Sequence, residues 1–466
     1  MIVKAPLPVA GDTQLIAPAR IQEFRSRHRG SVIEPGDADY DVARRVWNAM
    51  IDRRPAVIAR CRSAADVVVA VRFARANRLP IAVRGGGHNV AGRATCDDGL
   101  VIDFCDMRGI SVDAGARTAR AEAGLRWEEF DRATQALGLA TTGGTVGDTG
   151  IAGLTLGGGF GWLGGVHGMT VDNLLGADLV LASGELVRAS ADEHADLFWA
   201  IRGGGGNFGV ATSFDYRLHP VGPTIVGGMV LHPFDRASEV LRFYRECLRT
   251  APDELSIAAV LVTTPDEVKA VALAAAYAGP VCEGERALAP LKQFGPPALD
   301  MMGPLPYLEQ QSMLANAMPP NVLNYWKAEF VRTVSDEVIA SAVDAYRVVP
   351  SPLSSILFFP IHGAASRVPS GATAYPHRAG VHMGLYALWR DRASTAENIA
   401  WVRAAWSAIQ PGAAGGVYVN ELGDDEGDER VRLAYAGNYD RLARVKARYD
   451  PENVFRLNAN IPPRAG

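Results

Sequence analysis

The sequence predicts an α+β protein in which both ends of the chain form one binding domain around an inserted antiparallel sheet covered by helices. At 466 residues the chain exceeds the size at which a single hydrophobic core keeps growing. Apolar strand patterns alternate with helical patterns before residue 220, whereas Pro-rich turns separate apolar runs after it. We therefore expect a first domain over 1–219, an inserted domain over 220–409, and a return to the first domain over 410–466.

The elements of the first domain follow from local patterns. Ser63, followed three residues later by Asp66, predicts a capped helix that Pro80 stops. A helix is also expected at 127–138, with Trp127, Phe130, Ala133 and Leu137 on its buried face. Strands are expected at 80–83, at 99–104 and, around a Ser-Gly turn, twice within 172–190; residues 196–218 predict a helix, a glycine bend and a strand.

Glycine occupies 11 of the 23 positions from 143 to 165, and this composition predicts neither an ordinary helix nor an ordinary strand there. In the last part, residues 432–463 predict a basic helix that ends at an Asp-Pro pair, followed by an extended segment.

Composition excludes several classes of function. The formal net charge is −4 and no long Lys/Arg run occurs, so we expect no nucleic-acid partner. Five widely spaced cysteines without a C-x-x-C motif argue against a disulfide framework and against structural zinc, and no H-E-x-x-H motif predicts a metal site. The first 14 residues lack an apolar secretion segment, and no later stretch predicts a membrane span. These features predict a cytoplasmic protein that is a monomer or a small homo-oligomer.

Two stretches of the sequence match a dinucleotide-binding glycine motif. The pattern G-x-G-x-x-G occurs at Gly159, Gly161 and Gly164, and again at Gly204, Gly206 and Gly209. A dinucleotide fingerprint must follow a strand and open an uninterrupted helix, and neither match does so. An NAD-dependent reductase therefore remains only an alternative, and the absence of G-x-x-x-x-G-K-[ST] gives no support for a nucleoside triphosphatase.

Three glycine bends, at 84–92, 143–165 and 203–209, carry the binding hypothesis. Glycine exposes backbone N–H groups, which form anion-binding concavities. An Arg precedes two of the bends, Arg84 and Arg202. Tight turns for packing alone would explain one bend, but three bends favour a long anionic ligand.

A resemblance to a known family is carried by four stretches in the same order: VRGGGHNVAG, GGTVGDTGIAGLTLGGGFGWLGG, DLFWAIRGGGGNFGVATSF and NYDRLARVKARYDPENVFRLNANIPP. The chain resembles the berberine-bridge-enzyme-like FAD-linked oxidases of the vanillyl-alcohol oxidase/p-cresol methylhydroxylase superfamily. The resemblance implies a PCMH-type FAD-binding domain and a covalent 8α-histidyl bond from His88 to the flavin. The cofactor-binding residues that it implies are Arg84, Gly85, Gly86, Gly87, His88, Asn89, Gly144, Val146, Gly150, Gly153, Gly158, Gly209, Val210, Asn420 and Asn458.

The sequence departs from the family pattern at two positions. The Cys that forms a second flavin bond in many members falls on Val146, so we expect attachment through His88 only. The Glu that serves as base in plant members falls on Gly384, five residues before Trp389. Tyr386, Tyr418 and His382 remain as candidate bases, and two phenols could act together if one lowered the pKa of the other.

The resemblance implies oxidation of an alcohol or amine carbon, with hydride transfer to the flavin and return of the electrons to O₂ as hydrogen peroxide. Aromatic residues of the inserted domain favour a hydrophobic secondary metabolite or amine as the small-molecule substrate; they are Tyr325, Trp326, Phe330, Phe358, Phe359 and Tyr386. A dehydrogenase with another electron acceptor, or a non-catalytic flavin-binding protein, would fit the same motifs.

Overall fold

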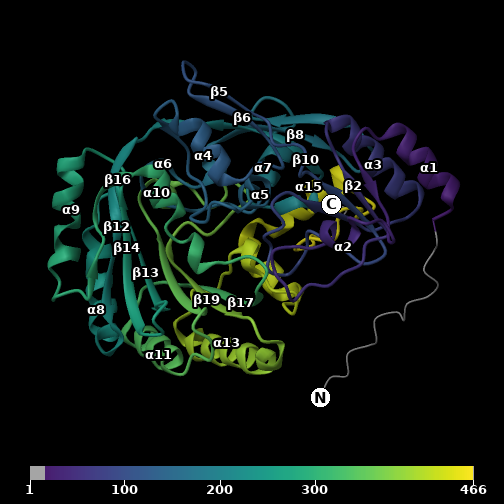
Figure 1. Ribbon diagram of the computed structural model, residues 1–466. Coiled ribbons are helices and arrows are strands. Elements are labelled where there is room, and N and C mark those ends of the chain that lie inside the picture. Colours follow the sequence, from purple (N-terminus) through teal and green to yellow (C-terminus); the bar gives the residue numbers. More distant parts are fainter. Residues whose placement is uncertain (1–15, 465–466) are drawn as a thin grey trace.

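The computed structural model describes residues 16–464 and confirms the α+β fold class (Figure 1). The expectation about a secretion segment in residues 1–14 lies outside the described residues. Within 16–464, no helix combines the length and the apolar character that crossing a membrane requires.

The first part of the fold contains two sheets. In one, the parallel strands β2 (Val57–Arg60), β4 (Leu100–Asp103) and β3 (Ile81–Arg84) lie in that order, with β1 (Val32–Ile33) antiparallel at the edge of β2. The helix α3 (Ala64–Ala76) connects β2 to β3, and Ser63 Oγ accepts a hydrogen bond from the Asp66 nitrogen at 3.3 Å. The N-terminal helices are α1 (Pro18–Arg27) and α2 (Tyr40–Ala43).

The second sheet is antiparallel and has five strands in the order β5-β6-β10-β8-β9. Their bounds are β5 (Ile110–Asp113), β6 (Thr118–Glu122), β8 (Leu174–Val180), β9 (Leu186–Ser190) and β10 (Val210–Arg217), with α7 (Ala195–Ile201) before the glycine bend that leads into β10. A short pair, β7 (Leu139–Ala140) and β11 (His219–Pro220), lies at the transition to the rest of the chain.

The helix α4 (Trp127–Gln135) differs from its prediction in its buried face. Trp127 and Phe130 are buried as expected, but the helix ends before Leu137, whose exposed fraction is 50%. Asp131 is fully buried instead, so this face carries a carboxyl group into the protein interior.

The prediction for the glycine-rich segment was wrong in part. The segment contains two short helices, α5 (Ile151–Leu156) and α6 (Gly164–His167). Within α5 the only glycine is Gly153, and Ile151 and Thr155 are buried, so tertiary packing overrides the high glycine content around the helix.

The third sheet is the largest and is antiparallel at every pairing. Its eight strands are β12 (Thr224–Pro233), β13 (Leu255–Thr263), β14 (Lys269–Tyr277), β15 (Leu299–Asp300), β16 (Gly303–Pro306), β17 (Leu323–Val331), β18 (Ser355–Ile361) and β19 (Gly380–Trp389). Four helices cover the face away from the first two sheets: α8 (Ala237–Thr250), α9 (Val281–Gln293), α11 (Asp336–Arg347) and α13 (Thr395–Ile409) (Figure 1). The shorter helices α10 (Tyr307–Ser312) and α12 (Gly363–Arg367) lie in the connections of this sheet.

The C-terminal helices α14 (Asp428–Tyr435) and α15 (Tyr439–Tyr449) pack into the hydrophobic core of the first part. α15 ends at Tyr449, immediately before the Asp450-Pro451 pair, as the sequence predicts. The Lys446 ammonium group is fully buried and donates to Asp450 Oδ2 at 2.6 Å, to the Asn207 carbonyl at 2.6 Å and to the Phe455 carbonyl at 3.0 Å. These hydrogen bonds link the C-terminal segment to Asn207 in the third glycine bend.

Candidate active site

A cavity of about 960 Å³ lies where the three glycine bends, the largest sheet and the C-terminal segment meet. Its volume is at the upper end of the range of about 300–1,000 Å³ for small-molecule sites. The three bends contribute Gly85, Gly86, Gly87, Gly144, Gly150, Gly153, Gly205, Gly206 and Gly209 to its wall. The structure therefore brings together segments that are more than 100 residues apart in the sequence.

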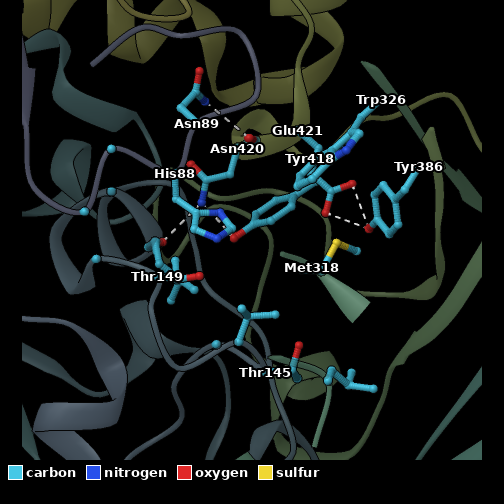
Figure 2. A pocket seen from close by; sticks show the side chains of 18 of the residues that line it. His88, Asn89, Thr145, Thr149, Met318, Trp326, Tyr386, Tyr418, Asn420 and Glu421 are labelled. Atoms are coloured by element: carbon cyan, nitrogen blue, oxygen red, sulfur yellow. Dashed lines mark hydrogen bonds between the residues drawn. The ribbon is translucent and has the colours of Figure 1, made fainter. Parts of the chain in front are cut away.

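Most of the residues expected to bind the cofactor line this cavity. Besides seven of the glycines above, they include His88, Asn89, Val146, Val210, Asn420 and Asn458. Asn89 Nδ2 donates to the Asn420 carbonyl at 3.4 Å, which joins the first bend to the C-terminal segment (Figure 2).

Arg84 and Gly158 do not line the cavity. The Arg84 guanidinium is buried against Asp103, with Nη2 2.6 Å from Oδ2, so this arginine is an internal ion pair. Gly158 has φ +125°, and a Cβ there would lie 2.7 Å from the Tyr375 ring. Arg202 also lies outside the cavity, where Nη2 donates to the Ala372 carbonyl at 3.2 Å.

Gly86 and Gly150 show why no side chain fits where the first two bends meet. A Cβ at Gly86 would lie 2.3 Å from the Gly150 nitrogen, and one at Gly150 would lie 2.3 Å from the Gly86 nitrogen. Since these two backbones are in direct contact, any side chain would separate them. At Gly153 a Cβ would meet no atom within 4 Å, so this part of the wall borders open space.

His88 stands at the cavity wall between an aromatic ring and a carboxylate. Its ring stacks on Trp47 with 4.2 Å between centroids, and Nε2 lies 3.3 Å from Asp148 Oδ1. Burial raises the pKa of Asp148, but His88 and Arg126 together outweigh burial and hold that pKa below its ordinary value. Asp148 was not singled out in the sequence, although it lies in the second glycine segment.

Arg93 is a further cavity residue that sequence reasoning missed. Within residues 16–464 its guanidinium forms no ion pair and no side-chain hydrogen bond, and burial lowers its pKa. An arginine remains charged in such surroundings. Arg93 therefore gives the cavity wall a positive charge that an anionic ligand would neutralise.

Tyr418 lines the cavity next to the second glycine segment, and its phenolic oxygen accepts two hydrogen bonds. The Gly159 nitrogen donates at 3.1 Å and Asn420 Nδ2 donates at 2.8 Å. Burial raises the pKa of Tyr418, whereas these two donors lower it. Within residues 16–464, the Tyr418 hydroxyl donates no hydrogen bond of its own.

Tyr386 meets a carboxylate that the sequence analysis did not identify. Its hydroxyl donates to Glu421, with Oε1 at 3.0 Å and Oε2 at 3.2 Å (Figure 2). His382 Nε2 lies 3.2 Å from Glu421 Oε2 and 3.4 Å from the Tyr386 oxygen. The only signal in the sequence is that Glu421 follows Tyr418 by three residues.

The expectation that one phenol lowers the pKa of the other was wrong for this arrangement. Burial and the Glu421 charge raise the pKa of Tyr386 well above 10, and Tyr418 raises it further. Tyr386 and Tyr418 both line the cavity, but they have separate hydrogen-bond partners.

The wall formed by the largest sheet and its loops is mainly apolar. It includes Met229, Leu231, Val260, Val262, Ala274, Met301, Met313, Leu314, Met318, Leu353 and Leu357. Of the six aromatic residues expected to form the substrate surface, only Trp326 and Tyr386 line the cavity. Phe358 belongs to the core under the helices, Phe330 and Phe359 are buried elsewhere, and Tyr325 donates to Asp425 Oδ2 at 2.7 Å.

Comparisons with known proteins identify the class of this site. Residues 55–190 match the family model described as "FAD binding domain", and residues 417–462 match the one described as "Berberine and berberine like". The chain is thus an FAD-linked oxidoreductase with a PCMH-type FAD-binding fold. Within 16–464, no group of three or more His, Cys, Asp or Glu side chains could hold a metal ion.

Full-length relatives give the family. An FAD-linked oxidoreductase of Dictyostelium discoideum is 31% identical over 97% of this chain and 98% of its own. The (R)-6-hydroxynicotine oxidase of Paenarthrobacter nicotinovorans is 31% identical over 93% of this chain and 97% of its own. The chain belongs to the berberine-bridge-enzyme-like family of FAD-linked oxidoreductases.

Solved structures agree with the fold. The crystal structure of 6-hydroxy-D-nicotine oxidase from Arthrobacter nicotinovorans superimposes with a TM-score of 0.87 at 29% identity, covering 94% of this chain and 98% of that one. Chitooligosaccharide oxidase, at 23% identity and a TM-score of 0.85 over 96% of this chain and all of its own, shares the fold.

Proposed function

We propose that the protein is an oxidase that removes a hydride from an alcohol or amine carbon of a small hydrophobic metabolite and reduces O₂ to hydrogen peroxide. The observation that carries this proposal is the shared cavity: three glycine bends and His88 meet two phenols and an apolar wall there. The parts 1–219 and 410–466 would hold the cofactor, and 220–409 would hold the substrate.

The residues present fit FAD. Gly86 and Gly150 line the cavity with their backbones, Gly153 borders open space there, and Arg93 supplies a positive charge for a phosphate-bearing ligand. When bound, FAD supplies the two-electron acceptor for substrate oxidation, while the protein supplies position and electrostatics.

His88 is the proposed single point of covalent attachment. Its ring lines the cavity, and the contact of Nε2 with Asp148 Oδ1, at 3.3 Å, does not have the geometry of a hydrogen bond. Val146, also at the wall, offers no sulfur for a second bond. Protein precipitated in acid and washed should stay yellow, because a carbon–nitrogen bond survives unfolding. His88→Ala should release the colour, and wild-type protein that loses all its flavin in acid would contradict covalent attachment.

The proton released from the substrate would pass to Tyr418 or Tyr386, since both phenols line the cavity. Tyr418→Phe and Tyr386→Phe should each keep the flavin bound and slow its reduction by about 10²–10⁴-fold, the usual size of a lost acid–base group. Unchanged reduction rates in both variants would exclude both phenols as proton acceptors.

The decisive experiment is anaerobic bleaching of the bound flavin with a panel of apolar alcohols, amines and sugars. We expect bleaching by apolar alcohols or amines, because the wall opposite the glycine bends carries mainly Met, Leu, Val and Ala side chains. Air should then restore the colour with release of peroxide. Recovery only with an artificial acceptor would indicate a dehydrogenase, and bleaching by sugars alone would contradict the substrate class.

A further inference from the structure

Glu421 lies inside a closed set of polar contacts at the cavity wall. Both of its carboxylate oxygens accept from the Tyr386 hydroxyl, at 3.0 and 3.2 Å, and Oε2 lies 3.2 Å from His382 Nε2. Within residues 16–464, no lysine or arginine forms an ion pair with this carboxylate. One phenol and one imidazole therefore contact its carboxylate, and both belong to β19.

The two contacts come from one strand. Tyr386 and His382 are four residues apart on β19, on the same face, and their side chains are 3% and 0% exposed. Among the described residues, the phenols of Tyr418 and Tyr375 also lie close enough to interact with this pair. Tyr386 and Glu421 line the cavity (Figure 2). His382 is not part of the cavity wall.

We propose that Glu421 is the final acceptor of the proton that the substrate loses, that Tyr386 transfers this proton, and that His382 is a positioning residue for the carboxylate. The proposal rests on the oxidase function above and names residues for its proton step. It also supplies the carboxylate that the sequence lacks at Gly384.

The proton transfer from the substrate through Tyr386 to Glu421 needs no further proton donor or acceptor. The bond from hydrogen to the substrate oxygen or nitrogen breaks as a new bond forms to the Tyr386 oxygen. In the same movement the Tyr386 O–H bond breaks and its proton binds Glu421. One proton leaves the substrate and one carboxylate becomes a carboxylic acid, while the phenol is unchanged.

The contacts favour a transferring role for Tyr386 over a role as an isolated base. A phenol whose hydroxyl already donates to a carboxylate keeps its own proton at neutral pH, and the pKa of Tyr386 is accordingly raised. Such a phenol can accept a proton only if it gives one away. Glu421 stands at 3.0 Å to receive it.

His382 orients the receiving group. Its ring is enclosed by Phe160, Phe330 and Tyr418, with centroids 5.0, 5.5 and 5.9 Å away. With the ring fixed in this way, Nε2 holds Oε2 of Glu421 within reach of Tyr386. His382→Gln should therefore slow flavin reduction less than Glu421→Gln, and the loss should appear in kcat more than in KM.

The test compares Glu421→Gln, Tyr386→Phe and the double variant by stopped-flow flavin reduction. Each single variant should reduce its flavin about 10²–10⁴-fold more slowly than wild type, and the double variant should be no slower than Tyr386→Phe, because the two groups act as one unit. Glu426→Gln removes a charge from the same segment without facing Tyr386 and should keep the wild-type rate. Independent losses that multiply in the double variant would overturn the relay.

A second measurement does not depend on turnover. Removal of the Glu421 charge should shift the ionisation of Tyr386 to lower pH, seen as the difference in tyrosinate absorbance between Glu421→Gln and Glu421→Gln/Tyr386→Phe. If Glu421→Gln fails to fold, Glu421→Asp keeps the negative charge but moves the carboxylate away from Tyr386 by one methylene. A flavin-reduction rate equal to wild type in that variant would overturn the proposal. Wild-type flavin that no substrate reduces would contradict the proposed function, while an unshifted Tyr386 titration would contradict the relay alone.

Discussion

Replacement of Asp131 by Asn should stabilise the protein at neutral and alkaline pH, because this aspartate is buried and no cation within residues 16–464 pairs with it. Its side chain on α4 is fully buried; Gln311 Nε2 donates to Oδ2 at 2.9 Å and also to the Gly144 carbonyl at 3.2 Å. Burial raises the pKa of Asp131 from 3.8 to about 7, although the bond from Gln311 lowers it. The Gln311 amide on α10 thus links the Asp131 carboxyl group on α4 to the second glycine segment.

The sign of the pH effect follows from proton binding. Below about pH 4 both the folded and the unfolded chain hold this proton, so Asp131 causes no penalty. Between about pH 4 and 7 the unfolded chain loses the proton while the folded chain keeps it, so stability falls as pH rises. A pKa of about 7 against 3.8 corresponds to a full penalty of about 4 kcal/mol above pH 7.

The assay is urea denaturation of wild type and Asp131→Asn at equal flavin content, at several pH values from 4 to 9. The advantage of the variant should grow by about 4 kcal/mol across this range, and subtraction of the two curves cancels the other titrating groups. Asp39→Asn changes an exposed aspartate and should show no such growth. An advantage that is constant with pH would refute a raised pKa for Asp131.

Three further outcomes follow from the structure. Lys446→Met should destabilise the protein by about 3–5 kcal/mol, because Asp450 is left as a buried charge; urea denaturation measures this, and Lys446→Met/Asp450→Leu should recover part of the loss. Gly205→Ala, at φ +71° on the cavity wall, should lower flavin content more than the Tm of flavin-free protein. Gly158→Ala, at φ +125° against Tyr375, should lower the Tm of flavin-free protein at least as much as it lowers flavin content. If Gly158→Ala mainly lowered flavin content and Gly205→Ala mainly lowered the Tm, the placement of these two glycines would be contradicted. Asp148→Asn should reduce the fraction of flavin retained after acid precipitation, since Asp148 faces His88 Nε2 at 3.3 Å, and an unchanged fraction would exclude a role in attachment.

The helical positions show where sequence reasoning failed. Periodicity placed Leu137 on the buried face of α4, but the chain leaves the helix after Gln135 and exposes that side chain. A buried Asp131 could not be predicted, because polar residues are assigned to the surface unless a partner is known, and Gln311 lies 180 positions away.

Arg84 and Arg93 show the same limit of sequence reasoning, because sequence position alone does not tell which arginine lines the cavity. A position next to a glycine bend made Arg84 look like an anion ligand, yet Asp103 on the neighbouring strand β4 pairs with it internally. Arg93 takes the place at the cavity because the loop after His88 turns it inward, and no local pattern encodes that turn.

The sequence by itself determined the α+β class, the three glycine bends, His88 as the residue beside them and the lack of a cysteine at Val146, because these depend on residue identity and short spacing. Only the tertiary structure decided which groups meet. The antiparallel pairing of β19 with β18 and β17, together with the return of the C-terminal segment, brings Glu421 to Tyr386 and His382. Contacts between residues 35 or more positions apart depend on how whole elements pack, and a single sequence does not record that packing.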